Sequence, residues 1–263
     1  MYPYEIFPGV DMYLIMICLA AMGAIFVFRF FADKLKVRAK LQNLCMINAV
    51  VSIMVGYYSA VLFQALYNIK KLGKFIIDAN TGATFYGGLI GGAACFLAIY
   101  FIAGRFIFKE DHKYLYAFWN VADIAAACIA IAHCFGRIGC LMVGCCYGAE
   151  TDAWYGIYMI NLGKRVVPIQ LYEAIFLALL FAFFAYRILK NKTYNLQLYM
   201  MLYGVWRFAI EYARDDYRGY SFVSFLSPSQ LTAVFMIIGS VAVIFLQRYF
   251  MRKLDEKQRK TQE

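Results

Sequence analysis

The fold of this chain is decided around residues 132–148, which read AHCFGRIGCLMVGCCYG. The stretch begins inside a long apolar segment, Leu115–Phe135, and then places Arg137 among glycines. This is about the depth at which the hydrocarbon core of a membrane gives way to headgroups. A lone guanidinium there costs about 2.5–3.5 kcal/mol on insertion scales. We therefore expect Arg137 to have a partner, which is either a protein carboxylate or an anionic group of a lipid.

The composition of the whole chain is typical of a membrane protein. Hydrophobic residues make up 63% of its 263 residues and charged residues only 16%, whereas soluble domains have about 45–50% and about 25%. The net charge of +10 would also suit a nucleic-acid-binding protein. The basic residues, however, lie between apolar runs and at the C-terminus, as the positive-inside rule describes. Composition thus favours a membrane protein and argues against nucleic acid as a partner.

The apolar runs predict an all-α integral membrane protein with seven transmembrane helices in a single polytopic domain, residues 1–263. The runs are Asp11–Phe31, Leu44–Leu66, Thr84–Phe108, Leu115–Phe135, Pro168–Leu189, Leu196–Tyr212 and Leu226–Phe250. About two thirds of the Lys and Arg residues fall on one side of such a topology, which places the C-terminus in the cytoplasm and the N-terminus outside. Arg137, Arg207 and Arg214 then lie at the outer leaflet.

The longest external connection, residues 141–166, is expected to form a small cap between the fourth and fifth spans. It carries Trp154, Tyr155 and Tyr158, which are typical anchors at a membrane interface.

The third span opens with two overlapping pairs of small residues, Gly87 with Gly91 and Gly88 with Gly92. Such faces let helices approach closely in lipid, so helix packing is one interpretation. The other is that a glycine-walled helix end beside Tyr86 leaves room for the headgroup of a substrate.

Charged and polar residues recur at helical spacing near the outer ends of three spans. His133 and Arg137 are four residues apart, Gln170 and Glu173 open the fifth span, and Tyr203, Arg207, Glu211 and Arg214 follow one stripe. One interpretation is an intrahelical ion pair between Arg207 and Glu211, with Glu173 or Asp123 left for the other arginines. The other is that arginines from different helices bind a phosphodiester, for which the planar guanidinium is suited. Asp123 lies deeper and is expected to serve packing.

His133 and the cysteines leave further alternatives open. His133 is a general base or a hydrogen-bonded structural residue, because its unperturbed pKa is near neutrality. Cys134, Cys140, Cys145 and Cys146 cluster in the central stretch, and Cys140, Cys145 and Cys146 could form a disulfide on the oxidising side. They lack the C-x-x-C spacing of a zinc site, so no metal is expected. No nucleotide-binding motif is present, and no cofactor is expected.

Several motifs together resemble one family, the bacterial prolipoprotein diacylglyceryl transferases. They are residues 86–91 (YGGLIG), 136–139 (GRIG), 168–173 (PIQLYE), the stripe from Tyr203 to Arg214, and Leu226-Ser227-x-x-Gln230, in that chain order. The resemblance implies a seven-helix enzyme of the bacterial inner membrane. It would move the diacylglyceryl group of phosphatidylglycerol to the lipobox cysteine of a prolipoprotein and release glycerol phosphate. The signal peptide of the prolipoprotein would then be a binding partner.

The resemblance also implies roles for individual residues. Arg137 matches the phospholipid-binding arginine of the family, and Arg207 and Glu211 match its essential arginine and the glutamate beside it. The catalytic candidates are Arg207, Glu211, Tyr86 and His133. The candidates for phospholipid binding are Arg137, Arg214, Gly87, Gly88, Gln170 and Tyr203.

The chain also departs from the family pattern. The family has His at the positions of Tyr86 and Val167, Asn at Cys140 and Glu at Cys145. Two alternatives therefore stay open: the same donor with a different acceptor, and a lipid-binding or lipid-transporting membrane protein without catalysis.

Overall fold

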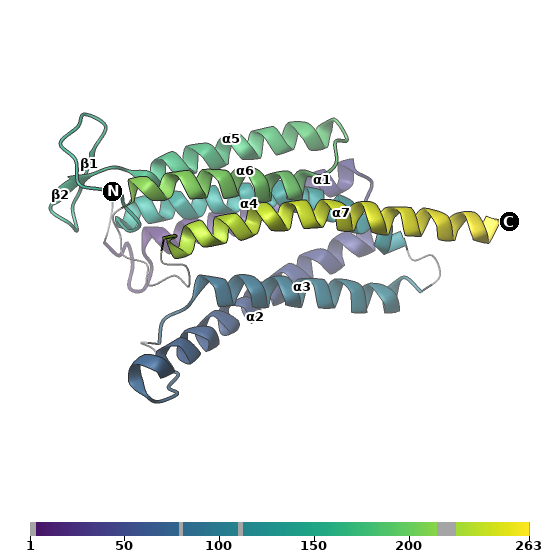
Figure 1. Cartoon of the computed structure of the whole chain (residues 1–263), viewed down its shortest axis with the longest axis horizontal. Coiled ribbons are helices and arrows are strands. Elements are labelled where there is room, and N and C mark those ends of the chain that lie inside the picture. Colours follow the sequence, from purple (N-terminus) through teal and green to yellow (C-terminus); the bar gives the residue numbers. More distant parts are fainter. Residues whose placement is uncertain (1–3, 79–80, 110–112, 215–224, 263) are drawn as a thin grey trace. The chain divides into compact units, whose positions relative to one another are not determined.

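The computed structural model describes residues 4–78, 81–109, 113–214 and 225–262, and nearly all of its regular structure is helical (Figure 1). Contacts divide the chain into two compact units, Lys36–Ala117 and the combination of Met1–Leu35 with Phe118–Glu263. The expectation of a single domain stays a prediction.

The unit Lys36–Ala117 is built on two helices, α2 (Ala39–Leu72) and α3 (Phe85–Ile107), which pack on each other. The glycines at the start of α3 make this packing possible. A Cβ atom on Gly87 would lie 2.6 Å from Cβ of Phe63, and one on Gly56 would lie 3.0 Å from the carbonyl oxygen of Gly88. The structure thus places Gly87 and Gly88 against α2, as helix packing predicts. Their role toward a lipid is not tested.

The other unit contains α1 (Met12–Lys34), most of α4 (Lys113–Val143), α5 (Ile169–Leu189), α6 (Asn195–Ile210) and α7 (Pro228–Gln262). α6 packs against α5 and α7, and α1 contacts α5. In Figure 1 the long axes of α4, α5 and α6 run in nearly the same direction. Ala126, Ala127 and Ala130 of α4 are completely buried, because alanines let the neighbouring helices approach closely.

A small hairpin connects α4 to α5, where the sequence predicts a cap. Strands β1 (Ile157–Met159) and β2 (Lys164–Val166) are antiparallel. Backbone hydrogen bonds from Gly148 N to Val167 O (2.9 Å) and from Ala149 N to Ala213 O (3.2 Å) attach the neighbouring loop to the start of α5 and to the chain beyond α6. That this cap is external stays a prediction.

Six described helices are long and apolar enough to cross a membrane, which makes the chain a multi-pass membrane protein. Of the seven expected spans, α6 is not among these six. Its 16 residues form a helix about 24 Å long, which is shorter than the hydrocarbon core of about 30 Å. Seven spans are thus not confirmed.

Two helix limits differ from the expected ones in a way that shapes the site. α4 continues eight residues past Phe135 to Val143, because the glycines there do not end the helix, and this keeps Arg137 on the same helix as His133. α6 ends at Ile210 and is followed by a 3-10 turn, Glu211–Ala213. Tyr203 and Arg207 therefore lie on the α-helix, whereas Glu211 lies in the 3-10 turn.

Candidate functional site

The partner of Arg137 is a protein carboxylate. Nε of Arg137 lies 3.0 Å from Oε2 of Glu173, which is in the first turns of α5. The side chain of Glu173 is 0% exposed and that of Arg137 is 14% exposed. Because a buried carboxylate is costly unless it is paired and hydrogen-bonded, each residue offsets the desolvation of the other.

Tyr203 and His133 complete the surroundings of Glu173. The hydroxyl group of Tyr203 on α6 donates a hydrogen bond of 2.7 Å to Oε1 of Glu173. Nε2 of His133 lies 4.0 Å from the same oxygen, and its Nδ1 lies 3.4 Å from the hydroxyl of Tyr199. The rings of His133 and Tyr203 meet edge to face at 4.9 Å. α4, α5 and α6 therefore meet at one buried carboxylate.

A second ion pair lies one turn further along α6. Nη2 of Arg207 lies 2.9 Å from Oε2 of Glu211 and donates a 2.8 Å hydrogen bond to Oγ of Ser229 at the start of α7. Oγ of Ser227 donates to Oε1 of Glu211 at 2.8 Å. The ion pair of the first interpretation is thus present, and Ser227 and Ser229 at the start of α7 hydrogen-bond to it.

Arg207 keeps one donor unused. Its side chain is 8% exposed, and its Nη1 is buried without a hydrogen-bond partner in the described part of the chain. Arg207 also interacts electrostatically with Glu173, so the two ion pairs belong to one charged site. A buried donor without an acceptor costs about 1–3 kcal/mol, which an anionic ligand would offset.

Arg214 joins this site at its edge. Its Nε lies 3.9 Å from Oε2 of Glu211, and its side chain is 2% exposed. Its backbone pairs with Gly148, so the chain beyond α6 is fixed to the loop after α4.

Gln170 acts on the same loop. Its side chain is buried, and its Nε2 donates a hydrogen bond to the carbonyl oxygen of Cys145. The structure therefore shows Gln170 holding the loop after α4, in the turn of α5 before Glu173.

Asp123 and Tyr86 are two further polar residues that the sequence singles out. Oδ1 of Asp123 accepts a 2.6 Å hydrogen bond from the backbone of Asn195, so Asp123 supports the beginning of α6, in agreement with a packing role. Tyr86, with Gly87 and Gly88, belongs to the unit Lys36–Ala117, and its predicted catalytic role is not tested.

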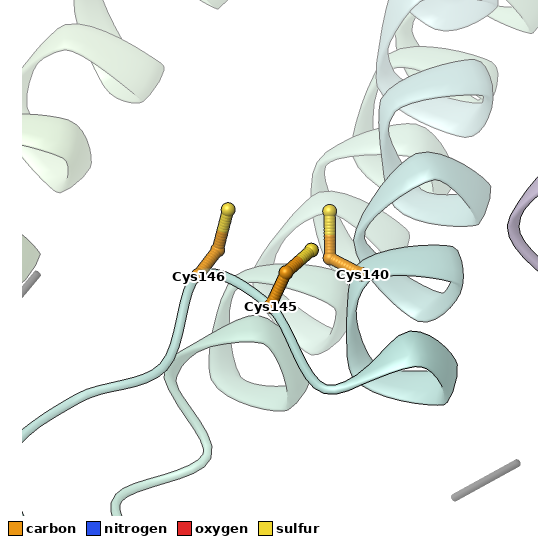
Figure 2. Close-up of side chains that lie close together, drawn as sticks. All are labelled: Cys140, Cys145 and Cys146. Atoms are coloured by element: carbon orange, nitrogen blue, oxygen red, sulfur yellow. The ribbon is translucent and has the colours of Figure 1, made fainter. Parts of the chain in front are cut away.

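Three cysteines gather at the end of α4. The Sγ atoms of Cys140, Cys145 and Cys146 all lie within 4.8 Å of one another, and none is in a disulfide (Figure 2). Hydrogen bonds with the other two thiols, together with burial, raise the pKa of Cys145 above its ordinary value. Beside two other thiols, Cys145 is therefore protonated and neutral at pH 7.

Sequence reasoning ranked Glu173 too low and missed Ser227 and Ser229 as partners of the charged site. The sequence makes Glu173 one of two possible carboxylate partners for an arginine, although it lies in the first turns of an apolar helix, where a carboxylate is costly. Ser227 could have been found in the sequence, because a Ser directly before a helix that begins with Pro is a typical N-cap. In the structure its Oγ accepts a hydrogen bond of 3.1 Å from the backbone N–H of Gln230. No pattern in the sequence points to Ser229.

Spanning helices and buried arginine–carboxylate pairs define a class, the multi-pass membrane proteins with a charged site inside the helix bundle. Comparison with known sequences makes the assignment specific. A family model described as prolipoprotein diacylglyceryl transferase matches residues 5–246. The chain belongs to this family, and it is a transferase.

Curated relatives agree along most of the chain. The phosphatidylglycerol–prolipoprotein diacylglyceryl transferase 2 of Clostridium perfringens is 31% identical over 224 residues, which cover 81% of this chain and 81% of the relative. The enzyme of the same name from Clostridium tetani is 31% identical over 211 residues, 76% of this chain and 80% of the relative. That of Campylobacter curvus is 28% identical over 264 residues, 93% and 92% of the two chains.

Proposed function

We propose that this chain transfers the diacylglyceryl group of phosphatidylglycerol to the lipobox cysteine of a prolipoprotein and releases glycerol phosphate. The names of the curated relatives support both substrates, and they favour this reaction over a different acceptor and over a role without catalysis. The observation that carries the donor half is Nη1 of Arg207, a buried guanidinium donor without an acceptor among the described residues.

In this proposal the phosphodiester lies between Arg137 and Arg207. Nη1 of Arg207 donates to a non-bridging oxygen, and Arg137 supplies the second positive charge from α4. Glu211 and Ser229 hold the Arg207 side chain in place. Glu173 and Tyr203 do the same for Arg137, and Arg214 and Gln170 fix the loop that borders the site.

The chemistry breaks a carbon–oxygen bond. The acceptor sulfur forms a bond to the glycerol carbon, and the electron pair of the carbon–oxygen bond stays on the departing glycerol phosphate. A phosphodiester with one negative charge thus becomes a monoester with two, and two guanidiniums stabilise the additional charge. His133 or Tyr86 is the proposed acid–base residue, with Gly87 and Gly88 at the lipid.

The membrane arrangement is part of the same proposal. α6 is a seventh, short span, the N-terminus lies outside, and the C-terminus lies in the cytoplasm of a bacterial cell with the protein in its inner membrane. The positive charges of the C-terminal run support this orientation. The site then opens at the outer leaflet, below the cap that contains β1 and β2.

The experiment is a turnover assay with purified protein in detergent that contains phosphatidylglycerol. A lipobox peptide is added, and both its mass and the released glycerol phosphate are followed. We expect a diacylglyceryl mass on the peptide and a loss of about 100- to 1,000-fold for Arg207→Ala and Arg137→Lys, because each loses an aligned donor. Arg29→Ala is the matched control, since the side chain of Arg29 is half exposed and forms an ion pair with Asp33 on the same helix, α1. Unchanged turnover in both site variants would disprove the site.

A further inference from the structure

The cysteine cluster has the form of a metal site rather than of a disulfide. Cys140 comes from the last turn of α4, and Cys145 and Cys146 come from the loop that follows (Figure 2). Gly144, with φ of 73°, turns the chain back, and Cys145 N donates to Cys140 O at 3.0 Å. The three thiols consequently point to the same side of the loop.

Both the number and the spacing of the sulfurs fit a zinc ion. A disulfide joins two thiols and would leave the third over. A zinc ion takes thiolates at about 2.3 Å in a tetrahedron, which places sulfur atoms about 3.8 Å apart. The sulfurs already lie within 4.8 Å of one another, so small side-chain movements close the site. Three protein ligands with an open fourth position are the pattern of a catalytic zinc.

We propose that Cys140, Cys145 and Cys146 bind a zinc ion whose fourth position takes the acceptor thiol. This inference rests on the proposed function, because only that function supplies a thiol substrate.

The cluster lies beside the charged site. Cys140 is three residues after Arg137 on α4, hence on the same side of the helix, and Arg137 interacts electrostatically with Cys140 and Cys146. Gln170, one turn from Glu173 on α5, holds the carbonyl group of Cys145. A thiol bound at the cluster is therefore next to the arginine that we assign to the phosphodiester.

The step balances without a redox partner. The acceptor thiol replaces a water at the zinc and loses its proton to solvent, because a thiol that coordinates zinc is deprotonated. The bound sulfur forms the carbon–sulfur bond while the carbon–oxygen bond breaks and its electron pair leaves with glycerol phosphate. The product is a neutral thioether, which binds zinc weakly and is replaced by water.

The first test titrates the reduced, metal-free, full-length protein with Co²⁺ alone. We expect a thiolate-to-cobalt charge-transfer band that saturates at about one Co²⁺ per chain and is displaced by Zn²⁺. Cys140→Ser, Cys145→Ser and Cys146→Ser should each weaken the band. Cys18→Ser should leave it unchanged, because Cys18 is an exposed residue of α1. Absence of the band from the reduced wild-type protein would overturn the proposal.

The second test asks whether the fourth position takes a thiol, and it uses only the wild-type protein, so it does not depend on the folding of variants. A lipobox peptide with Cys should strengthen the cobalt band, and the same peptide with Ser should not. A band that is insensitive to the Cys peptide would show a structural metal and overturn thiol activation.

Activity separates this inference from the proposed function. Removal of zinc should lower peptide lipidation about 100-fold, and added Zn²⁺ should restore it. Equal lipidation with and without zinc would overturn the inference and leave the proposed function intact. No lipidation in either state would reject the proposed function, while the Co²⁺ titration would still decide whether the cluster binds metal.

Discussion

The α2–α3 pair and the helices around α4 bury polar groups in different ways. Among the described residues of the unit Lys36–Ala117, the buried polar side chains are neutral: Gln42, Asn48, Ser52 and Thr81. They satisfy neighbouring groups: Asn48 Nδ2 donates to the carbonyl oxygen of Phe96 at 2.9 Å. The other unit buries charged groups, including Asp123, Glu173 and Arg207.

This difference shows where the chain buries charged groups, which are more costly to desolvate than neutral ones. Neutral hydrogen bonds and small residues are sufficient to join helices in lipid. Buried ion pairs are not needed for that purpose, since apolar residues of similar volume are often as stabilising. We therefore attribute the charged residues around α4 to the anionic ligand that we propose for them, and the α2–α3 contact to packing.

The most severe way to break the charged site is Glu173→Gln. It leaves Arg137 without its carboxylate, and removal of one partner of a buried pair costs about 3–5 kcal/mol. We expect a large drop in the free energy of unfolding, measured by denaturant titration in detergent. Glu150→Gln is the control, because the ion pair of Glu150 with Lys164 is largely exposed and should change stability little.

A double variant then separates stability from function. Arg137→Met with Glu173→Met removes both charges, and we expect it to recover most of the lost stability but no turnover. Recovery of turnover would show that the pair serves only folding.

The corresponding way to break the α2–α3 contact is Gly56→Leu. A Cβ atom there would lie 3.0 Å from the carbonyl oxygen of Gly88, so the larger side chain forces the helices apart at about 1–3 kcal/mol. Hydrogen exchange followed by mass spectrometry should show faster exchange in α2 and α3 and unchanged exchange in α5 and α6. Ile53→Ala, at an exposed residue of α2, is the control. Equal loosening of both units would contradict the division.

The sequence predicts most of this fold because hydrophobic runs identify helices directly. It also offers the pairing of Arg207 with Glu211 as one of two interpretations, because a four-residue spacing allows such a pair. It misplaces the end of α4, because glycines inside a helix look like an end when the packing around them is unknown. Gly139, for example, lies against Tyr13 and Met16 of α1, a contact that only the fold reveals.

The cysteine cluster shows the same limit. Three cysteines with four residues between the first and the second do not match a zinc motif. Only a helix that reaches Val143 and a turn at Gly144 bring the sulfurs together. The position of Glu173 between Arg137 of α4 and Tyr203 of α6 likewise depends on how three helices pack. It cannot be predicted from the residue spacing within one helix.

A milder change sharpens the comparison within the charged site. Tyr203→Phe removes the 2.7 Å hydrogen bond to Glu173 and keeps the ring against His133. Loss of a hydrogen bond to a buried charge should lower the free energy of unfolding by about 1–3 kcal/mol, with a clear loss of turnover. Tyr186→Phe, at an exposed position of α5, is the control. Full turnover in Tyr203→Phe would restrict Tyr203 to a structural role.

The smallest expected effect comes from the matching hydrogen bond of the α2–α3 pair. Asn48→Ala removes the bond to Phe96 and leaves Ser52 Oγ, which donates to Asn48 Oδ1 at 3.1 Å, without this acceptor. Single interhelical hydrogen bonds in membrane proteins contribute about 0.6 kcal/mol on average, so the denaturation midpoint should move slightly and turnover should stay at the wild-type level. A loss of turnover as large as that of Tyr203→Phe would mean that neutral polar groups on α2 also support catalysis, and the contrast between the two units would no longer hold.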